Sequence, residues 1–215
     1  MLLLTTLACG NGWLSYPGGQ SDIETAIWIK GTIDGTDTVV MILSNSRLSC
    51  DLGATDEDDP AQVEAAYVQA AAALYREDAR NLVLWLKRDA GDVLGSYDVA
   101  GADDGAKRWS EALYMGVNEA VLGYDGGLFR YYEPTDYDVR EAGAGTVQLD
   151  RLDAETAKGS FDFTDIEVAG RFSAEHCEDS VELFEQLGLL DLSPTDLFGA
   201  YEDSTPEDSD DIILD

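Results

Sequence analysis

Short segments that alternate apolar with polar residues, separated by turn signals, constrain the fold of this chain more than any other feature. The clearest are residues 146–152 and 157–163, in which apolar and polar side chains take turns along the segment. This period-two alternation is typical of β-strands with one buried face. With residues 168–173 as a third strand, the two segments predict a three-strand antiparallel meander.

The N-terminal part of the chain predicts a β-hairpin. Residues 24–33 and 38–43 are rich in apolar and β-branched side chains, which favour strands. Asp34-Gly35 lies between them, and this dipeptide is a strong signal for a tight turn. We therefore expect two antiparallel strands joined at Asp34-Gly35.

The middle of the chain is less uniform. Residues 81–87 form an almost continuous apolar run, which indicates a strand buried on both faces. Residues 95–99 predict a short edge-like strand. Residues 111–124 are compatible with either a helix or a strand, and residues 124–128 form another turn signal.

One helix is predicted over residues 60–79. Pro60 suits the first helical position, and Asp58 or Asp59 can cap the helix. Four apolar residues recur at helical spacing and should pack on a sheet: Val63, Tyr67, Ala70 and Leu74. The expected fold class is α+β and mainly β, with an antiparallel sheet, a sandwich or a partly open barrel and one packed helix.

Cys9 follows a short apolar run that ends in small residues, Leu4-Thr5-Thr6-Leu7-Ala8. Bacterial signal peptidase cuts such a pattern in lipoproteins, and the Cys then carries the acyl chains. No Lys or Arg precedes the run, so an ordinary thiol at Cys9 is the alternative. Because Gly10 is not the Asp that signals inner-membrane retention, we expect an exported protein, lipid-anchored at the outer membrane.

These patterns divide the chain into four regions. Residues 1–8 are expected to be a signal-peptide remnant, and residues 9–22, rich in Gly, Ser and Asn, a lipidated tether. Residues 23–177 form the β-rich domain with its one helix. Residues 178–215 are expected to form a short helix and an acidic, partly disordered tail.

Cys50 and Cys177 remain as an even pair if Cys9 is lipidated. In an oxidising compartment the two can form a disulfide, and both are expected at strand ends. The bridge would tie an early strand to the last one. Two free buried thiols are the alternative.

The net charge of −31, from 44 acidic and 13 basic residues, excludes several partners. A chain this acidic repels nucleic acid and anionic lipid surfaces. Salt adaptation and the binding of cations or a basic partner both account for such a charge. The acids are spread along the whole chain, which favours salt adaptation.

The search for chemical motifs finds no catalytic signature. His176 is the only His, and its strand neighbour Cys177 should point to the opposite face, which separates the two groups. There is no Cys/His zinc cluster, phosphate loop or Ser elbow, and no cofactor is expected. Three acidic residues are weak candidates for divalent ions, although a solvated charge run is favoured: Asp56, Asp58 and Asp59.

A cluster of aromatic residues offers a candidate binding surface. Aromatic side chains that flank a hairpin can bind sugars or proteins, although core packing is the commoner use. The candidates are Tyr124, Phe129, Tyr131 and Tyr132.

The order of several short pieces resembles a known group. The pieces that carry the resemblance are Leu43-Ser44-Asn45-Ser46-Arg47-Leu48-Ser49-Cys50, Gly145-Thr146-Val147-Gln148-Leu149, Gly159-Ser160-Phe161-Asp162-Phe163, Gly170-Arg171-Phe172-Ser173-Ala174 and Cys177. This order is similar to that of uncharacterised secreted lipoproteins of myxobacteria and their relatives, over residues 24–177. The resemblance implies a small β-rich domain with one helix and a disulfide, and it implies no reaction. Residues 109–138 and the acidic C-terminal extension depart from it.

Together these observations predict a lipid-anchored cell-envelope protein with a binding or structural role and no enzymatic activity. Its expected partners are the membrane, through the anchor, and an envelope protein or glycan. One alternative is an extracellular hydrolase that uses two carboxylates, because the chain is rich in acids. The other is a soluble halophilic cytosolic protein, which requires three free thiols.

Overall fold

A computed structural model describes residues 11–33, 35–48, 50, 68–89, 92–99, 107–125 and 129–177, with only the backbone for residues 123–125 and 129–131. Several predictions therefore lie outside the described residues. They are the signal remnant and Cys9, the acidic residues Asp56, Asp58 and Asp59, residues 60–67 of the predicted helix, and residues 178–215.

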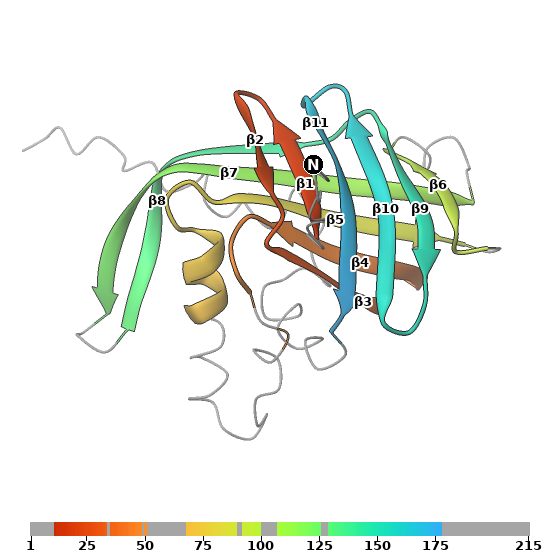
Figure 1. The fold of residues 1–215 in the computed structure, drawn as a ribbon, viewed down its shortest axis with the longest axis horizontal. Helices are drawn as coiled ribbons and strands as arrows, with labels where there is room; N and C mark the ends of the chain where they lie inside the picture. Colours follow the sequence, from red (N-terminus) through yellow and green to blue (C-terminus); the bar gives the residue numbers. More distant parts are fainter. Residues whose placement is uncertain are drawn as a thin grey trace, which may run out of the picture.

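In the described part of the chain, eleven strands form one sheet (Figure 1). The strands are β1 (Gly12–Tyr16), β2 (Gly19–Asp22), β3 (Thr25–Ile33), β4 (Thr36–Ser44), β5 (Arg80–Arg88), β6 (Gly95–Asp98), β7 (Arg108–Asp125), β8 (Phe129–Glu141), β9 (Thr146–Leu152), β10 (Thr156–Phe163) and β11 (Val168–His176).

Eight of these strands close into a barrel in the order β10-β9-β6-β7-β5-β4-β3-β11, because β11 pairs back onto β10. β1 and β2 extend the sheet from β11, and β8 pairs with β7. Most pairings are antiparallel, but β11–β3 and β6–β7 are parallel. The mainly β fold with a packed helix is confirmed, and its sheet is mixed.

The barrel explains why some strands alternate and others are apolar throughout. On β4, Met41 faces the barrel interior while Ile42 packs in a second apolar cluster on the outer face. On β10, Phe161 is buried inside, but Lys158 and Asp162 are exposed outside. A strand covered on both faces reads as a continuous apolar run, and a strand covered on one face alternates.

The outer apolar cluster is covered in part by a helix at residues 68–74. Ala70 is fully buried there and Leu74 is 9% exposed. The side-chain amide of Asn81, at the start of β5, donates to the carbonyl of Leu74 at 2.8 Å. The described part of the predicted helix therefore packs on the sheet as expected.

Among the described residues, no helix is long and apolar enough to cross a membrane.

The hairpins and the meander follow the sequence pattern. β3 and β4 pair from Thr25↔Ser44 to Ile33↔Thr36, with Gly35 at a positive φ of 77° in the turn. β9, β10 and β11 form the predicted antiparallel meander, with a register shift between Lys158 and Gly159.

Three predictions are corrected, and one open alternative is resolved. Residues 12–22, expected to be a tether, form β1 and β2, because the edge of β11 offers unpaired backbone groups to β1. The segment 111–124 lies within the strand β7. β6 is an interior strand rather than an edge, since it lies between β7 and β9. β4 ends at Ser44, so Cys50 lies beyond the strand.

β1 also closes one end of the barrel. Leu14 is fully buried in the interior cluster. The ring of Tyr16 stacks on Tyr114 of β7 with centroids 6.2 Å apart, and the guanidinium of Arg80 lies 5.1 Å from the Tyr16 ring centroid. Arg80 begins β5, so this is the end at which β4 finishes and β5 starts.

Candidate functional site

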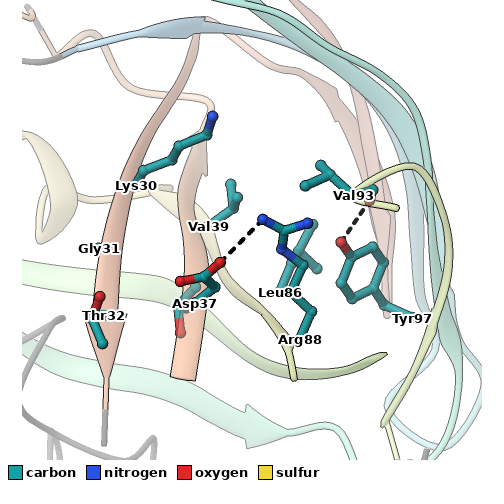
Figure 2. Close-up of a pocket in the computed structure, with 10 residues that line it drawn as sticks. Lys30, Gly31, Thr32, Asp37, Val39, Leu86, Arg88, Val93 and Tyr97 are labelled. Carbon is teal, nitrogen blue, oxygen red and sulfur yellow. Dashed lines mark hydrogen bonds and ion pairs between the residues drawn. The ribbon is translucent and has the colours of Figure 1, made fainter. Parts of the chain in front are cut away.

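The opposite end of the barrel holds a pocket of about 320 Å³ (Figure 2). It lies where β3 and β5 approach their ends and β4 begins, with β6 and the residues before it on the far side. Its lining residues are Lys30, Gly31, Thr32, Asp37, Thr38, Val39, Leu86, Arg88, Val93 and Tyr97. Mouths of β-barrels are common small-molecule sites, and this volume is at the small end of their usual range.

Strand periodicity places charged side chains at the rim and apolar ones below them. On β3 the residue two positions before Lys30 is Trp28, which is 1% exposed in the interior cluster. On β5, Leu86 is buried inside, and Arg88 follows two residues later at the rim. On β4, Asp37 lies at the rim, two residues before the buried Val39. Since alternate residues share one face of a strand, each inward-facing apolar series ends in a charge at this mouth.

The strand register brings these groups together. Val39 pairs with Lys30 on one side and with Leu86 on the other. Asp37 pairs with Arg88, and the Nη2 of Arg88 lies 3.1 Å from Asp37 Oδ2. In Figure 2 the Arg88 guanidinium lies between the Lys30 side chain on one side and Val93 and Tyr97 on the other.

Lys30 supplies an ammonium group that has no ion-pair partner among the described residues. Its Nζ lies 5.6 Å from the centroid of the Trp28 ring, so the aromatic face supports the cation. The Trp28 indole N–H is buried and also lacks a hydrogen-bond acceptor within the described part of the chain. The Lys30 ammonium is therefore a charged donor that a ligand at this mouth can engage without displacing a described ion pair.

Tyr97 forms the far wall of the pocket. Its hydroxyl donates to the Val93 carbonyl at 2.6 Å, and the residue is 1% exposed. Burial raises the pKa of the Tyr97 phenol, although the nearby guanidinium groups of Arg108 and Arg88 oppose this shift. Tyr97 therefore remains a neutral phenol at neutral pH, and it contributes a polar but uncharged surface.

A second, open hollow of about 710 Å³ adjoins the disulfide. It is lined by Glu24, Thr25, Arg47, Leu48, Cys50, Glu175 and His176. The Arg47 Nε lies 2.9 Å from Glu24 Oε2, which neutralises one of the two carboxylates there. This hollow is wider and more open than the pocket at the barrel mouth, so it encloses a small ligand less completely.

The predicted disulfide is present. Cys50 and Cys177 are bonded with Cα atoms 5.3 Å apart, and Cys177 is 2% exposed. Both sulfurs lie near a carboxylate oxygen of Glu175, but sulfurs in a disulfide are not available as thiolate ligands. The ring of His176 instead lies on Trp28, with centroids 4.3 Å apart, so the described contacts of His176 and Cys177 are structural.

The aromatic candidates lie on a long ribbon formed by β7 and β8. β7 stops pairing with β5 at Gly116, whereas its pairing with β8 continues to Asp125↔Phe129, and Figure 1 shows this ribbon leaving the barrel. The candidates Tyr124, Phe129 and Tyr131 lie on it, but their side chains are outside the described set. Tyr132 is half-buried. Only the shared ribbon location of the four aromatic candidates is thus established.

The pocket residues Lys30, Asp37 and Arg88 were not identified from the sequence. The signal was present, because each lies two residues from an inward-facing apolar side chain: Trp28, Val39 and Leu86. It could be used only with knowledge of which face of each strand points into a closed barrel.

Comparisons with known proteins add no assignment: no protein-family model, curated protein or solved structure matches this chain.

Proposed function

We propose that this chain is a lipid-anchored protein of the bacterial cell envelope that binds a small molecule at the open mouth of its barrel. The observation that carries the binding role is the pocket of about 320 Å³, with charged groups at its rim and the buried side chains of Val39, Leu86 and Tyr97 below them. Few convergent polar groups over an apolar floor are typical of small-molecule sites.

The barrel is built to hold such a pocket in place. Three strands supply its charged rim: the central strand β4 pairs with β3 over its whole length and with β5 from Asp37 to Ser44. The opposite end is occupied by Leu14 and Tyr16 of β1. A site on paired strands keeps its geometry better than a site on loops, so the pocket is preorganised for a ligand.

Binding is favoured over hydrolysis by the charges in the pocket. Asp37 is the one carboxylate among the described lining residues, and it is engaged by Arg88. Glycoside hydrolysis by acids requires a pair of carboxyl groups across the scissile bond. The described lining thus supports a binding protein, since it contains no pair of acids for the alternative hydrolase.

The Cys50–Cys177 disulfide supports export, since such bonds persist in oxidising compartments. Export and the anchor are tested together by the intact mass of the protein from its own membranes, measured without reducing agent. The expected chain starts at Cys9, is heavier by its acyl groups and is lighter by two hydrogens. A chain that retains Met1 with all thiols free would overturn the envelope proposal and favour the cytosolic alternative.

The binding role is tested by screening a mixed library of neutral and charged fragments against the soluble chain by NMR. We expect chemical-shift changes at the amides of Lys30, Val39 and Tyr97. A Val93→Trp variant, which places an indole at the rim, should abolish these shifts while its circular dichroism stays unchanged. Fragment shifts that persist in this variant, or that map elsewhere, would contradict binding at the mouth.

A further inference from the structure

We propose that the mouth pocket selects small organic monocarboxylates, with Lys30 as the specificity-determining residue. This inference rests on the proposed function. The carboxylate would lie against the Lys30 ammonium and the Arg88 guanidinium, and the apolar body would rest on Val39, Leu86 and Val93. This assignment names both the charge and the chemical class of the ligand.

The sign of the ligand charge follows from the pocket's own groups. Among the described lining residues, two cations, Lys30 and Arg88, face one carboxylate, Asp37. A third cation, Arg108, stands opposite Arg88 on β7, and its guanidinium donates to the carbonyls of Asp92 and Leu94 beside the pocket. The Asp92 carboxylate, which accepts from the backbone N–H of Leu94, adds a second negative charge beside the pocket. The described groups at the mouth are therefore three cations and two carboxylates, an excess of positive charge in a chain whose net charge is −31.

Lys30 is the group that a ligand can engage without breaking an existing ion pair. Its Nζ contacts the Trp28 ring face and no carboxylate of the described residues. An ammonium has three donors, so it can keep its place over the ring and still donate to an anion. Arg88 is held by Asp37 at 3.1 Å, which orients a second positive group toward the opening.

The same balance of charges favours a monoanion over a dianion. Two cations and one carboxylate in the lining leave one positive charge to be matched. A phosphate monoester brings nearly two negative charges into a strongly acidic protein, and the second charge would meet no lining cation that is not already paired. A carboxylate brings one, and charge-assisted hydrogen bonds of this kind are stronger than neutral ones.

The apolar part of the ligand is set by the floor of the pocket. Val39 is 6% exposed and Leu86 is 1% exposed, so both belong to the packed interior. Val93 lies at the rim on the far side, where its carbonyl accepts a hydrogen bond from the Tyr97 hydroxyl. An aromatic or short aliphatic group can lie across these side chains, and a fully hydrated ion would gain nothing from them.

The test uses three probes of nearly equal shape: 2-naphthoate, the neutral 2-naphthamide and the cationic 2-naphthylmethylammonium. Binding is measured by isothermal titration calorimetry at fixed low salt with the folded chain. We expect naphthoate to bind at least about tenfold more tightly than the amide, and the cation not to bind. The probes are compared at one salt concentration, because added NaCl would screen both the attraction to Lys30 and the repulsion by the net charge of −31.

Two variants that remove the same charge identify the residue responsible. Lys30→Met keeps an apolar stem at the pocket, and Lys158→Met removes a positive charge from the exposed outer face of β10. Lys30→Met should reduce the preference for naphthoate over the amide to about twofold or less, whereas Lys158→Met should keep it. Equal losses in both variants would show a general charge effect and overturn the role of Lys30.

The outcomes separate this inference from the function on which it rests. If naphthoate and naphthamide bind equally and Val93→Trp abolishes both, the mouth is a binding site but the monocarboxylate assignment is wrong. If neither probe binds at millimolar concentration, the assignment is also wrong, and the fragment mapping then decides the proposed function by itself. Tighter binding of naphthyl phosphate, a phosphate monoester, than of naphthoate would overturn the monoanion preference.

Discussion

Reduction of the Cys50–Cys177 disulfide should lower the free energy of unfolding by about 5 kcal/mol. The two residues are 127 positions apart in the chain. In the chain-entropy model, closing a loop of this length removes roughly 16 cal/mol/K from the unfolded state, which corresponds to about 5 kcal/mol at 25 °C. In the native barrel the bridge lies next to the β3–β11 seam, which consists of two residue pairs, Glu175↔Ile27 and His176↔Trp28.

The assay is urea unfolding of oxidised and reduced protein, both in a Cys9→Ser background so that no third thiol exchanges with the bridge. The midpoint should fall strongly on reduction, and the melting temperature should drop by about 10–20 °C. A Cys50→Ala/Cys177→Ala double variant, measured without reductant, serves as the control for effects of the reducing agent itself.

A loss below about 1 kcal/mol with an unchanged slope against urea would refute the reasoning. It would mean that the unfolded chain gains little freedom when the bridge opens. The large loop between the two cysteines would then already be restricted in the unfolded state.

Three further predictions concern charge, packing and burial. The melting temperature should rise with NaCl concentration, because salt screens the self-repulsion of a chain with net charge −31, and a flat profile would count against this. Gly170→Ala should cost about 1–3 kcal/mol in urea unfolding, because a Cβ there would meet the backbone oxygen of Trp13 and lie 2.5 Å from the Phe161 ring. Gly143→Ala, whose Cβ would meet only the Asp165 carboxylate at 3.3 Å, should leave stability nearly unchanged, and equal losses in the two variants would contradict the packing argument. Burial raises the pKa of Tyr114 to about 12. Since the fold favours the neutral phenol, its stabilising effect is complete below pH 10 and is lost as the pH rises through about 12. Absorbance titration against Tyr114→Phe measures this pKa, and a transition near pH 10 would show that the phenol is not desolvated.

The positions of most strands could be predicted from local patterns. The alternation in residues 146–152 and 157–163 and the apolar run at residues 81–87 each reflect which faces of a strand are covered. The Asp34-Gly35 signal marked the β3–β4 turn because Gly35 takes a positive φ. The pairing of Cys50 with Cys177 followed from counting cysteines, and the structure confirms it.

Some proposals rest on the sequence alone. The lipid anchor at Cys9 and the resemblance to secreted lipoproteins concern residues or relationships that the described fold does not test, so they stay predictions. The divalent-ion candidates Asp56, Asp58 and Asp59 also stay predictions, because they lie outside the described residues.

Tertiary structure decided the conformation of the remaining segments, because their pairing depends on strands that are distant in the chain. Residues 12–22 carry the composition of a linker, yet they become strands where β11 supplies an edge. The ambiguous segment 111–124 becomes a strand between partners on β5 and β8. Local propensity is too weak to settle such segments, and long-range hydrogen bonds and burial override it.

The candidate site shows the same division most clearly. The sequence by itself determined that Lys30, Asp37 and Arg88 each lie two residues from an apolar side chain on a strand. The β4–β5 register decided that Asp37 meets Arg88, and barrel closure decided that these faces point inward and that β1 covers the opposite end. Strand periodicity specifies which residues share a face, but the curvature of the closed sheet determines which face encloses a pocket.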